Sequence, residues 1–169
     1  LQYFKDPEPN QKIVATPGHG THVPVWLLGS SLFSAQLAAR LGLPYSFASH
    51  FAPRMLSQAV QLYRENFQPS EYLEQPYVSM GVPTVVAKTD AEAQHLATSA
   101  YQRVLGLMRG QSLKLKPPVE SMDHIWTPAE RISVNNFYAL GQIGSPETVK
   151  AGLQDLLEHV DAVSYTHLR

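Results

Sequence analysis

Short apolar runs alternate with longer periodic stretches along this chain. Residues 25–28 read Val-Trp-Leu-Leu, a continuous apolar run typical of a strand buried on both faces. A helix is predicted over 32–41, because apolar residues recur there every four positions, at Phe33, Leu37 and Leu41. Gly42 stands where a C-terminal helix glycine belongs, and Pro44 prevents the helix from continuing. Residues 45–49 are the next predicted strand.

A short polar turn joins the first strand to its helix. Gly29, Ser30 and Ser31 interrupt the apolar run, and Ser34 follows Ser31 by three residues, on the same side of the first helical turn. The free N–H groups and hydroxyls of such a helix start suit an anion, commonly a phosphate. Ser30 or Ser31 could equally be a plain helix N-cap, so the pattern alone leaves both roles open.

The rest of the chain continues the alternation of strands and helices. Residues 75–87 predict one strand with a bend or bulge at Pro83, and 111–126 predict an irregular insert. Thr89 and Thr127 each open a capping-box pattern. Four further helices are predicted, over 53–66, 89–108, 127–138 and 145–160. This order indicates an α/β fold with a parallel sheet.

Composition narrows the class of protein. The 169 residues are 44% hydrophobic and 16% charged, which is typical of a globular domain. A net charge of -1 argues against nucleic acid or a membrane surface as a partner, and the lack of cysteine excludes disulfides and thiolate chemistry. No apolar run approaches the roughly 20 residues of a membrane span, and the start has no signal-peptide pattern. We expect a cytoplasmic protein, whose first residue, Leu1, is not the gene's own start.

Four motifs together resemble a known family. PVWLLGSS at 24–31 is followed by a helix, by GLP at 42–44 and by ASHFAP at 48–53, and GQIGSPE occupies 141–147. These motifs are similar to those of bacterial luciferase-like flavin monooxygenases, and the match extends over roughly Val14 to Ala162. The resemblance implies a TIM-like barrel, reduced FMN as cosubstrate or prosthetic group, and oxygen chemistry on an organic substrate.

Three strands cannot close an eight-stranded barrel, which takes about 250 residues. The resemblance therefore implies a partial TIM-like (β/α)8 barrel of about three parallel strands with their helices. We divide the chain into a lead-in loop over 1–22, the C-terminal part of the barrel over 23–162, and a foreign tail over 163–169 that departs from the family pattern. The family's second-strand histidine lies upstream, so we expect the chain to be an inactive fragment when alone.

The resemblance also assigns cofactor-binding residues. Ser31 and Ser34 align with hydroxyl residues that hold the FMN phosphate in the family, and Gly29 and Ser30 complete the predicted set. Where a luciferase has an acidic residue between its hydroxyl residues, this chain has Leu32. Donation from the backbone is therefore expected, whereas the side-chain details of the contact are open.

His50 is a candidate catalytic residue, because it follows a strand at the barrel edge that carries the chemistry. The alternative is a partly buried histidine bonded to loop carbonyls. Trp126, Phe137 and Tyr138 either border a substrate pocket or are packing aromatics. The remaining histidines make no metal-ligand pattern, so no metal is predicted.

The leading prediction is a flavin-dependent monooxygenase or oxidoreductase that uses reduced FMN and oxygen. A flavin reductase that supplies the reduced cofactor, or tightly bound FMN, is implied, together with a homodimeric parent. The alternatives are a deazaflavin-dependent oxidoreductase of the same fold, and a non-enzymatic flavin-binding protein.

Overall fold

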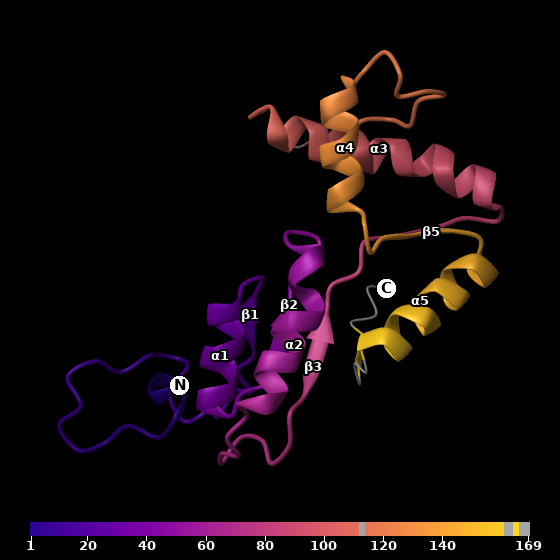
Figure 1. Cartoon of the computed structure of the whole chain (residues 1–169). Coiled ribbons are helices and arrows are strands. Elements are labelled where there is room, and N and C mark those ends of the chain that lie inside the picture. The colour runs from indigo at the N-terminus through magenta and orange to yellow at the C-terminus, as the bar shows by residue number, and fades with distance from the viewer. Residues whose placement is uncertain (112–113, 161–163, 166–169) are drawn as a thin grey trace.

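The computed structural model describes residues 1–111 and 114–160, and the backbone of 164–165 (Figure 1). In these residues it contains the five helices that the sequence predicts. Their bounds are α1 Leu32–Leu41, α2 Leu56–Glu65, α3 Asp90–Met108, α4 Pro128–Phe137 and α5 Pro146–Val160. Two short 3-10 helices precede β1 and α2, at Gln2–Phe4 and Pro53–Met55. No helix in the described part of the chain is both long and apolar enough to cross a membrane.

A four-stranded parallel sheet joins three strands from the first half of the chain to one from its C-terminal end. It contains β1 (Leu27–Gly29), β2 (Tyr45–Phe47), β3 (Val78–Met80) and β6 (Ser164–Tyr165), in the order β1-β2-β3-β6. Every pairing is parallel, and Leu28, Ser46 and Ser79 are aligned across the first three strands. The prediction of three parallel strands, adjacent and in chain order, is confirmed.

The strand predicted over 75–87 is two strands in two sheets, so this prediction was wrong in extent. β3 ends at Met80, and β4 (Thr84–Val86) pairs with β5 (Gln142–Gly144) in a separate two-stranded parallel sheet. Pro83 has no N–H to extend a ladder, which favours a break there. Its carbonyl accepts the N–H of Gln142 at 2.9 Å and thereby begins the second sheet.

Part of the C-terminal tail pairs with the sheet. β6 pairs with β3 through Ser79 opposite Ser164 and Met80 opposite Tyr165, within the segment 163–169 that the sequence marked as foreign. The other residues of that segment lie outside the described residues. The domain boundary at 163 stays a prediction.

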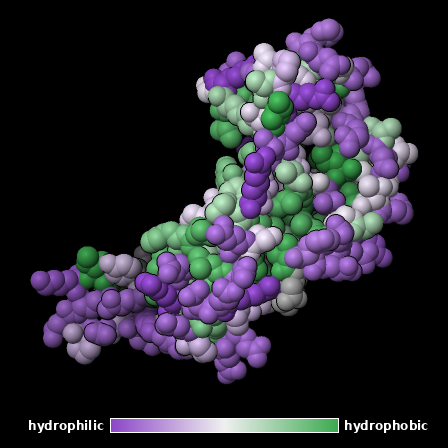
Figure 2. Space-filling model, in the orientation of Figure 1, coloured by the Kyte–Doolittle hydropathy of each residue, from purple (hydrophilic) through white to green (hydrophobic). Residues whose placement is uncertain are grey.

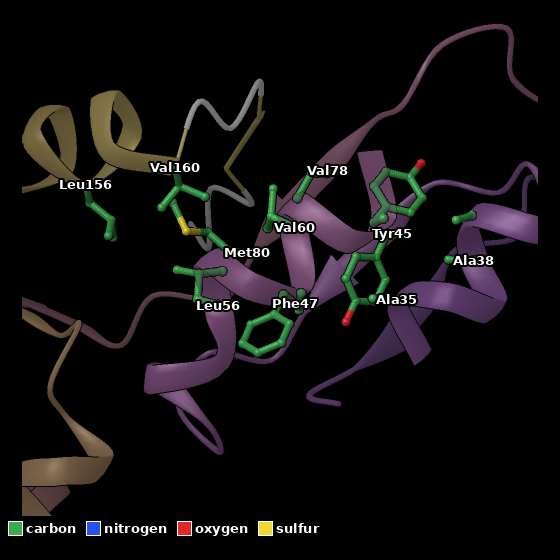
Figure 3. Close-up of a cluster of buried hydrophobic side chains, with 13 residues drawn as sticks. Ala35, Ala38, Tyr45, Phe47, Leu56, Val60, Val78, Met80, Leu156 and Val160 are labelled. Carbon is green, nitrogen blue, oxygen red and sulfur yellow. The ribbon is translucent and has the colours of Figure 1, made fainter. Parts of the chain in front are cut away.

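Small residues let α1 lie close to the sheet. Tyr45 and Phe47 fill the space between the sheet and the helices, as Figure 3 shows. The alanines of α1 line that space, together with apolar residues of α2, β3 and the end of α5: Ala35, Ala38, Ala39, Leu56, Ala59, Val60, Tyr63, Val78, Met80, Leu156 and Val160. In Figure 1, α1 and α2 lie side by side along the strands. Strands and helices therefore both contribute large side chains to this core, whereas the buried residues that α1 contributes to it are all alanines.

One burial prediction was wrong, and the periodic apolar residues that located α1 do not lie on its buried face. Phe33, Leu37 and Leu41, the periodic residues of α1, are 73%, 36% and 41% exposed. Leu28 is 68% exposed, so β1 is not buried on both faces. The helices cover only the face that carries Tyr45 and Phe47, and side chains on alternate positions of a strand point to the opposite face. Apolar side chains accordingly reach the surface in the middle of the molecule (Figure 2).

A second apolar cluster lies between α3, α4 and the insert that joins them. Its buried members are Val104, Leu105, Met122 and Val134. The insert is tied to α3, because Gln102 Nε2 donates to the Pro117 carbonyl at 2.9 Å and the Val119 N–H donates to Thr98 Oγ1 at 2.8 Å. Figure 1 shows this unit standing apart from the four-stranded sheet. The described residues therefore form two apolar cores.

Local signals set the helix ends largely as predicted. Gly42 ends α1 in the left-handed conformation, with φ of 58°. Thr127 and Glu130 form the predicted capping box of α4. Thr89 Oγ1 accepts the Glu92 N–H at 3.2 Å, but the Glu92 carboxylate accepts the N–H of Lys88 instead of closing the box. That box is thus only half formed.

Candidate functional site

The candidate site lies at the carboxyl ends of β1 and β2. Parallel strands place these ends at one edge, where α/β proteins bind their ligands. Ser30 and Ser31 follow β1 there, and His50 follows β2. The strand pairing thus brings the predicted anion site and the predicted catalytic histidine to the same edge of the sheet.

Ser31 is the N-cap of α1. Its hydroxyl accepts the Ser34 N–H at 3.2 Å, and its own N–H donates to Ser34 Oγ at 3.3 Å, so the two serines form a capping box. Ser31 is exposed, whereas Ser34 is buried. Of these two serines, Ser31 is therefore the one whose side chain is open to solvent or a ligand.

Ser34 stabilises the turn through buried hydrogen bonds. Its hydroxyl donates to the Ser31 carbonyl at 2.7 Å and lies 3.1 Å from the buried hydroxyl of Tyr45. A Cβ at Gly29 would collide with the Ser34 side chain. The space that Gly29 leaves open is thus occupied by Ser34. Ligand binding by Gly29 and Ser34 stays a prediction, and the geometry gives both a part in shaping the turn.

Backbone donors remain available at this helix start. In the described part of the chain, the N–H groups of Leu32 and Phe33 have no hydrogen-bond acceptor, as expected for a first helical turn. That turn contains no acidic side chain, so an anion would meet no carboxylate of α1. These donors, with the Ser31 hydroxyl and partly buried Ser30, fit a phosphate group.

His50 lies in an aromatic corner. Its ring centroid is 4.3 Å from that of Phe51 and 5.6 Å from that of Phe137, and Phe51 is 65% exposed. Burial lowers the pKa of the imidazole below its usual value. Its nitrogens have no hydrogen-bond partner among the described residues. These residues therefore do not show the alternative arrangement, in which the ring is bonded to loop carbonyls. A neutral imidazole can accept a proton there.

The other predicted aromatics separate into two groups. Trp126 and Tyr138 pack around Tyr101 in the second core, with ring centroids 6.0 and 5.2 Å from it. Phe137 contacts both this core and His50. Of the three residues considered for a substrate pocket, Phe137 alone contacts His50.

Sequence reasoning missed two contributors to this edge. Tyr45 was placed only in a strand, and Phe51 was counted only within the family motif. The alternation along β2 could have suggested that Tyr45 faces α1, but its hydroxyl bonds depend on tertiary contacts. Ser49 is also buried here, and its hydroxyl donates to the Gly81 carbonyl. This bond ties the ends of β2 and β3 together.

One hollow of the described residues lies away from this edge. A hollow of about 650 Å³ is lined by residues 70–77, at the amino ends of the strands. In barrels that end supports stability, and the chemistry takes place at the other end. Among the described residues, no group of three His, Asp or Glu side chains could hold a metal ion.

The family model of luciferase-like monooxygenases matches residues 2–161. The chain belongs to this family. A protein of Escherichia coli (strain K12) named luciferase-like monooxygenase is 45% identical over 162 residues, covering 96% of this chain and 48% of that protein. The uncharacterized protein YvbT of Bacillus subtilis (strain 168) is 51% identical over 162 residues, 95% of this chain and 48% of that protein. This luciferase-like chain thus spans about half the length of the curated relatives it matches.

Solved structures share the fold. Apo-MsnO8 is 26% identical, with a TM-score of 0.67 over 95% of this chain and 49% of that chain. The oxygenating constituent of 3,6-diketocamphane monooxygenase from Pseudomonas putida, in complex with FMN, has a TM-score of 0.54 at 18% identity, over 84% and 40% of the two chains. A coenzyme F420-dependent tetrahydromethanopterin reductase from Methanopyrus kandleri has a TM-score of 0.50 at 12% identity, over 88% and 46%. The predicted fold class, part of a TIM-like barrel, is confirmed.

Proposed function

We propose that this luciferase-like chain contributes the cofactor-phosphate site and one wall of the active site of a flavin-dependent monooxygenase. In this proposal the enzyme acts on an organic substrate with oxygen and reduced FMN. The FMN is either supplied by a reductase or bound as a cofactor, and the whole protein is a homodimer. One observation carries it: at the carboxyl edge of a parallel sheet, the first turn of α1 leaves the N–H groups of Leu32 and Phe33 without an acceptor among the described residues, beside the exposed Ser31 side chain.

The proposed roles follow from the contacts. The N–H groups of Leu32 and Phe33 and the hydroxyls of Ser30 and Ser31 would hold the phosphate. Gly29 and Ser34 would complete the site by shaping the turn, because the Ser34 side chain is buried beneath it. Reduced FMN, when bound, supplies the electrons with which oxygen is added to an organic substrate.

His50 would face the reacting groups from the end of β2. Its lowered pKa keeps the imidazole neutral near pH 7, so it is suited to take up a proton. Phe51 and Phe137 would exclude water beside it. This role fits a partly buried histidine without an internal hydrogen-bond partner among the described residues.

A second candidate function is a deazaflavin-dependent oxidoreductase that moves hydride without oxygen. The similarity to the F420-dependent reductase favours including it. The helix start suits the phosphate of either cofactor, so the comparison needs binding spectra with FMN and with the deazaflavin. Tighter binding of the deazaflavin would replace the first proposal by the second.

The experiment compares FMN with riboflavin, which lacks the phosphate. We expect Ser31→Ala, in the natural protein that contains this chain, to weaken FMN binding about tenfold, because a hydrogen bond to a charged group contributes about 1.5–3 kcal/mol. Riboflavin binding should be unchanged.

Ser145→Ala is the matched control. Ser145 Oγ accepts the Thr148 N–H at 3.3 Å at the start of α5, so this variant also removes a cap of about 1 kcal/mol, away from the site. If Ser31→Ala weakens the binding of FMN and riboflavin equally, or weakens the binding of neither, the phosphate must bind elsewhere.

A further inference from the structure

The buried hydroxyl of Tyr45 lies beneath the proposed phosphate site. It is 3.1 Å from Ser34 Oγ and 3.4 Å from the Ser31 carbonyl, and the Tyr45 side chain is fully buried. No other hydrogen-bond acceptor for this hydroxyl occurs in the part of the chain that the structure describes. Because a buried donor without an acceptor is costly, the Tyr45 proton is directed to Ser34 and Ser31.

Ser34 Oγ is surrounded by more donors than it can accept. Its own proton goes to the Ser31 carbonyl at 2.7 Å, the shortest contact in the cluster. Its two lone pairs then face the Ser31 N–H at 3.3 Å, the Tyr45 hydroxyl at 3.1 Å and the Ser31 hydroxyl at 3.3 Å. Three donors compete for two acceptor positions.

The Ser31 hydroxyl is the donor that gives way. The Ser31 N–H is fixed by the backbone, and the Tyr45 hydroxyl is enclosed by the core. The Ser31 side chain is exposed, and its oxygen keeps the Ser34 N–H as a donor whichever way its proton points. Its proton can therefore turn outward at the surface that carries the free N–H groups of Leu32 and Phe33.

We propose that Tyr45 is a positioning residue: by occupying a lone pair of Ser34 Oγ, it directs the Ser31 hydroxyl proton outward, toward the cofactor phosphate. This inference rests on the proposed function. Burial raises the pKa of the Tyr45 phenol, against a smaller lowering by Ser34, so the phenol stays protonated and remains a donor. Without it, Ser34 would recapture the Ser31 proton, and the phosphate would meet a lone pair instead.

The test is a double-mutant cycle in the natural protein that contains this chain. Dissociation constants for FMN and riboflavin are measured by flavin fluorescence for Tyr45→Phe, Ser31→Ala and the double variant. Tyr45→Phe should weaken FMN binding about tenfold and leave riboflavin within about twofold. In the Ser31→Ala background, Tyr45→Phe should cause no further loss, because the proton that it directs is gone.

Tyr63→Phe is the matched control. Tyr63 is also fully buried in this core, but its hydroxyl donates to the Leu43 carbonyl at 2.9 Å, away from α1's first turn. It should lower the melting temperature of the apo-protein as Tyr45→Phe does, without changing the ratio of FMN to riboflavin affinity. Should Tyr45→Phe not fold, 4-fluorophenylalanine at position 45 fills the volume of the hydroxyl without donating.

The outcomes separate the two proposals. If Ser31→Ala weakens FMN selectively but Tyr45→Phe behaves like Tyr63→Phe, the inference is overturned and the phosphate site stands. A full additional loss from Tyr45→Phe in the Ser31→Ala background would also overturn it, because Tyr45 would then act without Ser31. If Ser31→Ala has no selective effect, the phosphate site itself fails.

Discussion

Arg109 and Glu130 join the end of α3 to the start of α4 by a two-point ion pair. Arg109 Nε donates to Glu130 Oε1 at 2.7 Å, and Nη2 donates to Oε2 at 2.8 Å. Arg109 also donates to the Ile125 carbonyl at 2.9 Å, and Glu130 accepts the Thr127 N–H at 2.7 Å. One ion pair thus fixes α3, the insert and the cap of α4 in a single arrangement.

This pair should make the second core sensitive to acid. Hydrogen bonds from Arg109 and then from the Thr127 backbone lower the pKa of Glu130 from 4.5 to about 2. A carboxyl with a lowered folded-state pKa stabilises the fold above its unfolded pKa and loses that contribution as the pH falls toward the folded value. We therefore expect the urea concentration at the unfolding midpoint of the second core to decrease as the pH is lowered from about 4.5 to about 2.

Trp126 fluorescence in a Trp26→Phe background reports on this core. Glu130→Gln should lower the midpoint at pH 7 and remove the dependence on pH over this window. Glu120→Gln is the control, since the side chain of Glu120 is 98% exposed. The same pH profile for Glu130→Gln and the unchanged chain would contradict the prediction.

Gly42 and Gly110 should respond differently to the same substitution. Both have positive φ, 58° and 65°, but a Cβ at Gly42 would lie 2.5 Å from the Gln68 carbonyl oxygen, whereas one at Gly110 would meet nothing within 4 Å. Gly110→Ala should cost about 1 kcal/mol of unfolding free energy from strain alone. Gly42→Ala should cost at least about 2–3 kcal/mol, because its neighbours must also move. Urea unfolding tests the difference, and equal costs would show that the collision is relieved freely.

The exposed side chains of α1 should bind a hydrophobic dye. Phe33 and Leu37 are 73% and 36% exposed on one helix face. Replacing both by Ser should reduce dye fluorescence and self-association of the 169-residue chain, with a change in stability within about 1 kcal/mol. Ile132→Ser on α4, where Ile132 is 63% exposed, is the matched control. An equal loss of dye binding in both variants would mean that α1 has no special part in association.

His50 should regain an ordinary pKa when its aromatic neighbour is removed. Burial lowers the pKa of His50, and Phe137 is one of the two rings that cover it. Phe137→Ala should raise this pKa toward its usual value of 6.5, as measured by NMR titration.

The free energy of unfolding should depend on pH in a way that reflects the lowered pKa of His50. A histidine with a lowered folded-state pKa destabilises the fold as the pH falls from 6.5 toward that pKa, and Phe137→Ala should weaken this dependence. His159 is the internal reference, because its side chain is exposed on α5 and a hydrogen bond to the Asp155 backbone raises its pKa. Equal movement of both histidines would indicate a global change.

The sequence predicted the features that depend on neighbouring residues. The glycine and proline after α1, and the Thr127–Glu130 box, act over one helical turn, so their signals could be located in the chain alone. Parallel pairing of β1 and β2 followed from the strand-helix-strand order. The edge that holds Ser31 and His50 could be predicted for the same reason.

Features that depend on distant segments could not be predicted. Apolar periodicity located α1 but marked the wrong face, because the buried positions are alanines packed against Tyr45 and Phe47. β5 was not predicted because its three residues carry no strand pattern. They form a strand by pairing with β4. The Tyr45 hydroxyl likewise gains its hydrogen bonds to Ser34 and Ser31 only when β2 is packed against α1.

The separate core between α3 and α4 has a consequence for how related proteins can diverge. The chain leaves the two-stranded sheet after Val86 and returns at Gln142, and its excursion has its own apolar centre. Insertions or deletions in that excursion would be absorbed within it, leaving the strand edge with Ser31 untouched. Phe137 is where the excursion meets His50. Change in this segment could therefore alter the surroundings of the histidine while leaving the anion site as it is.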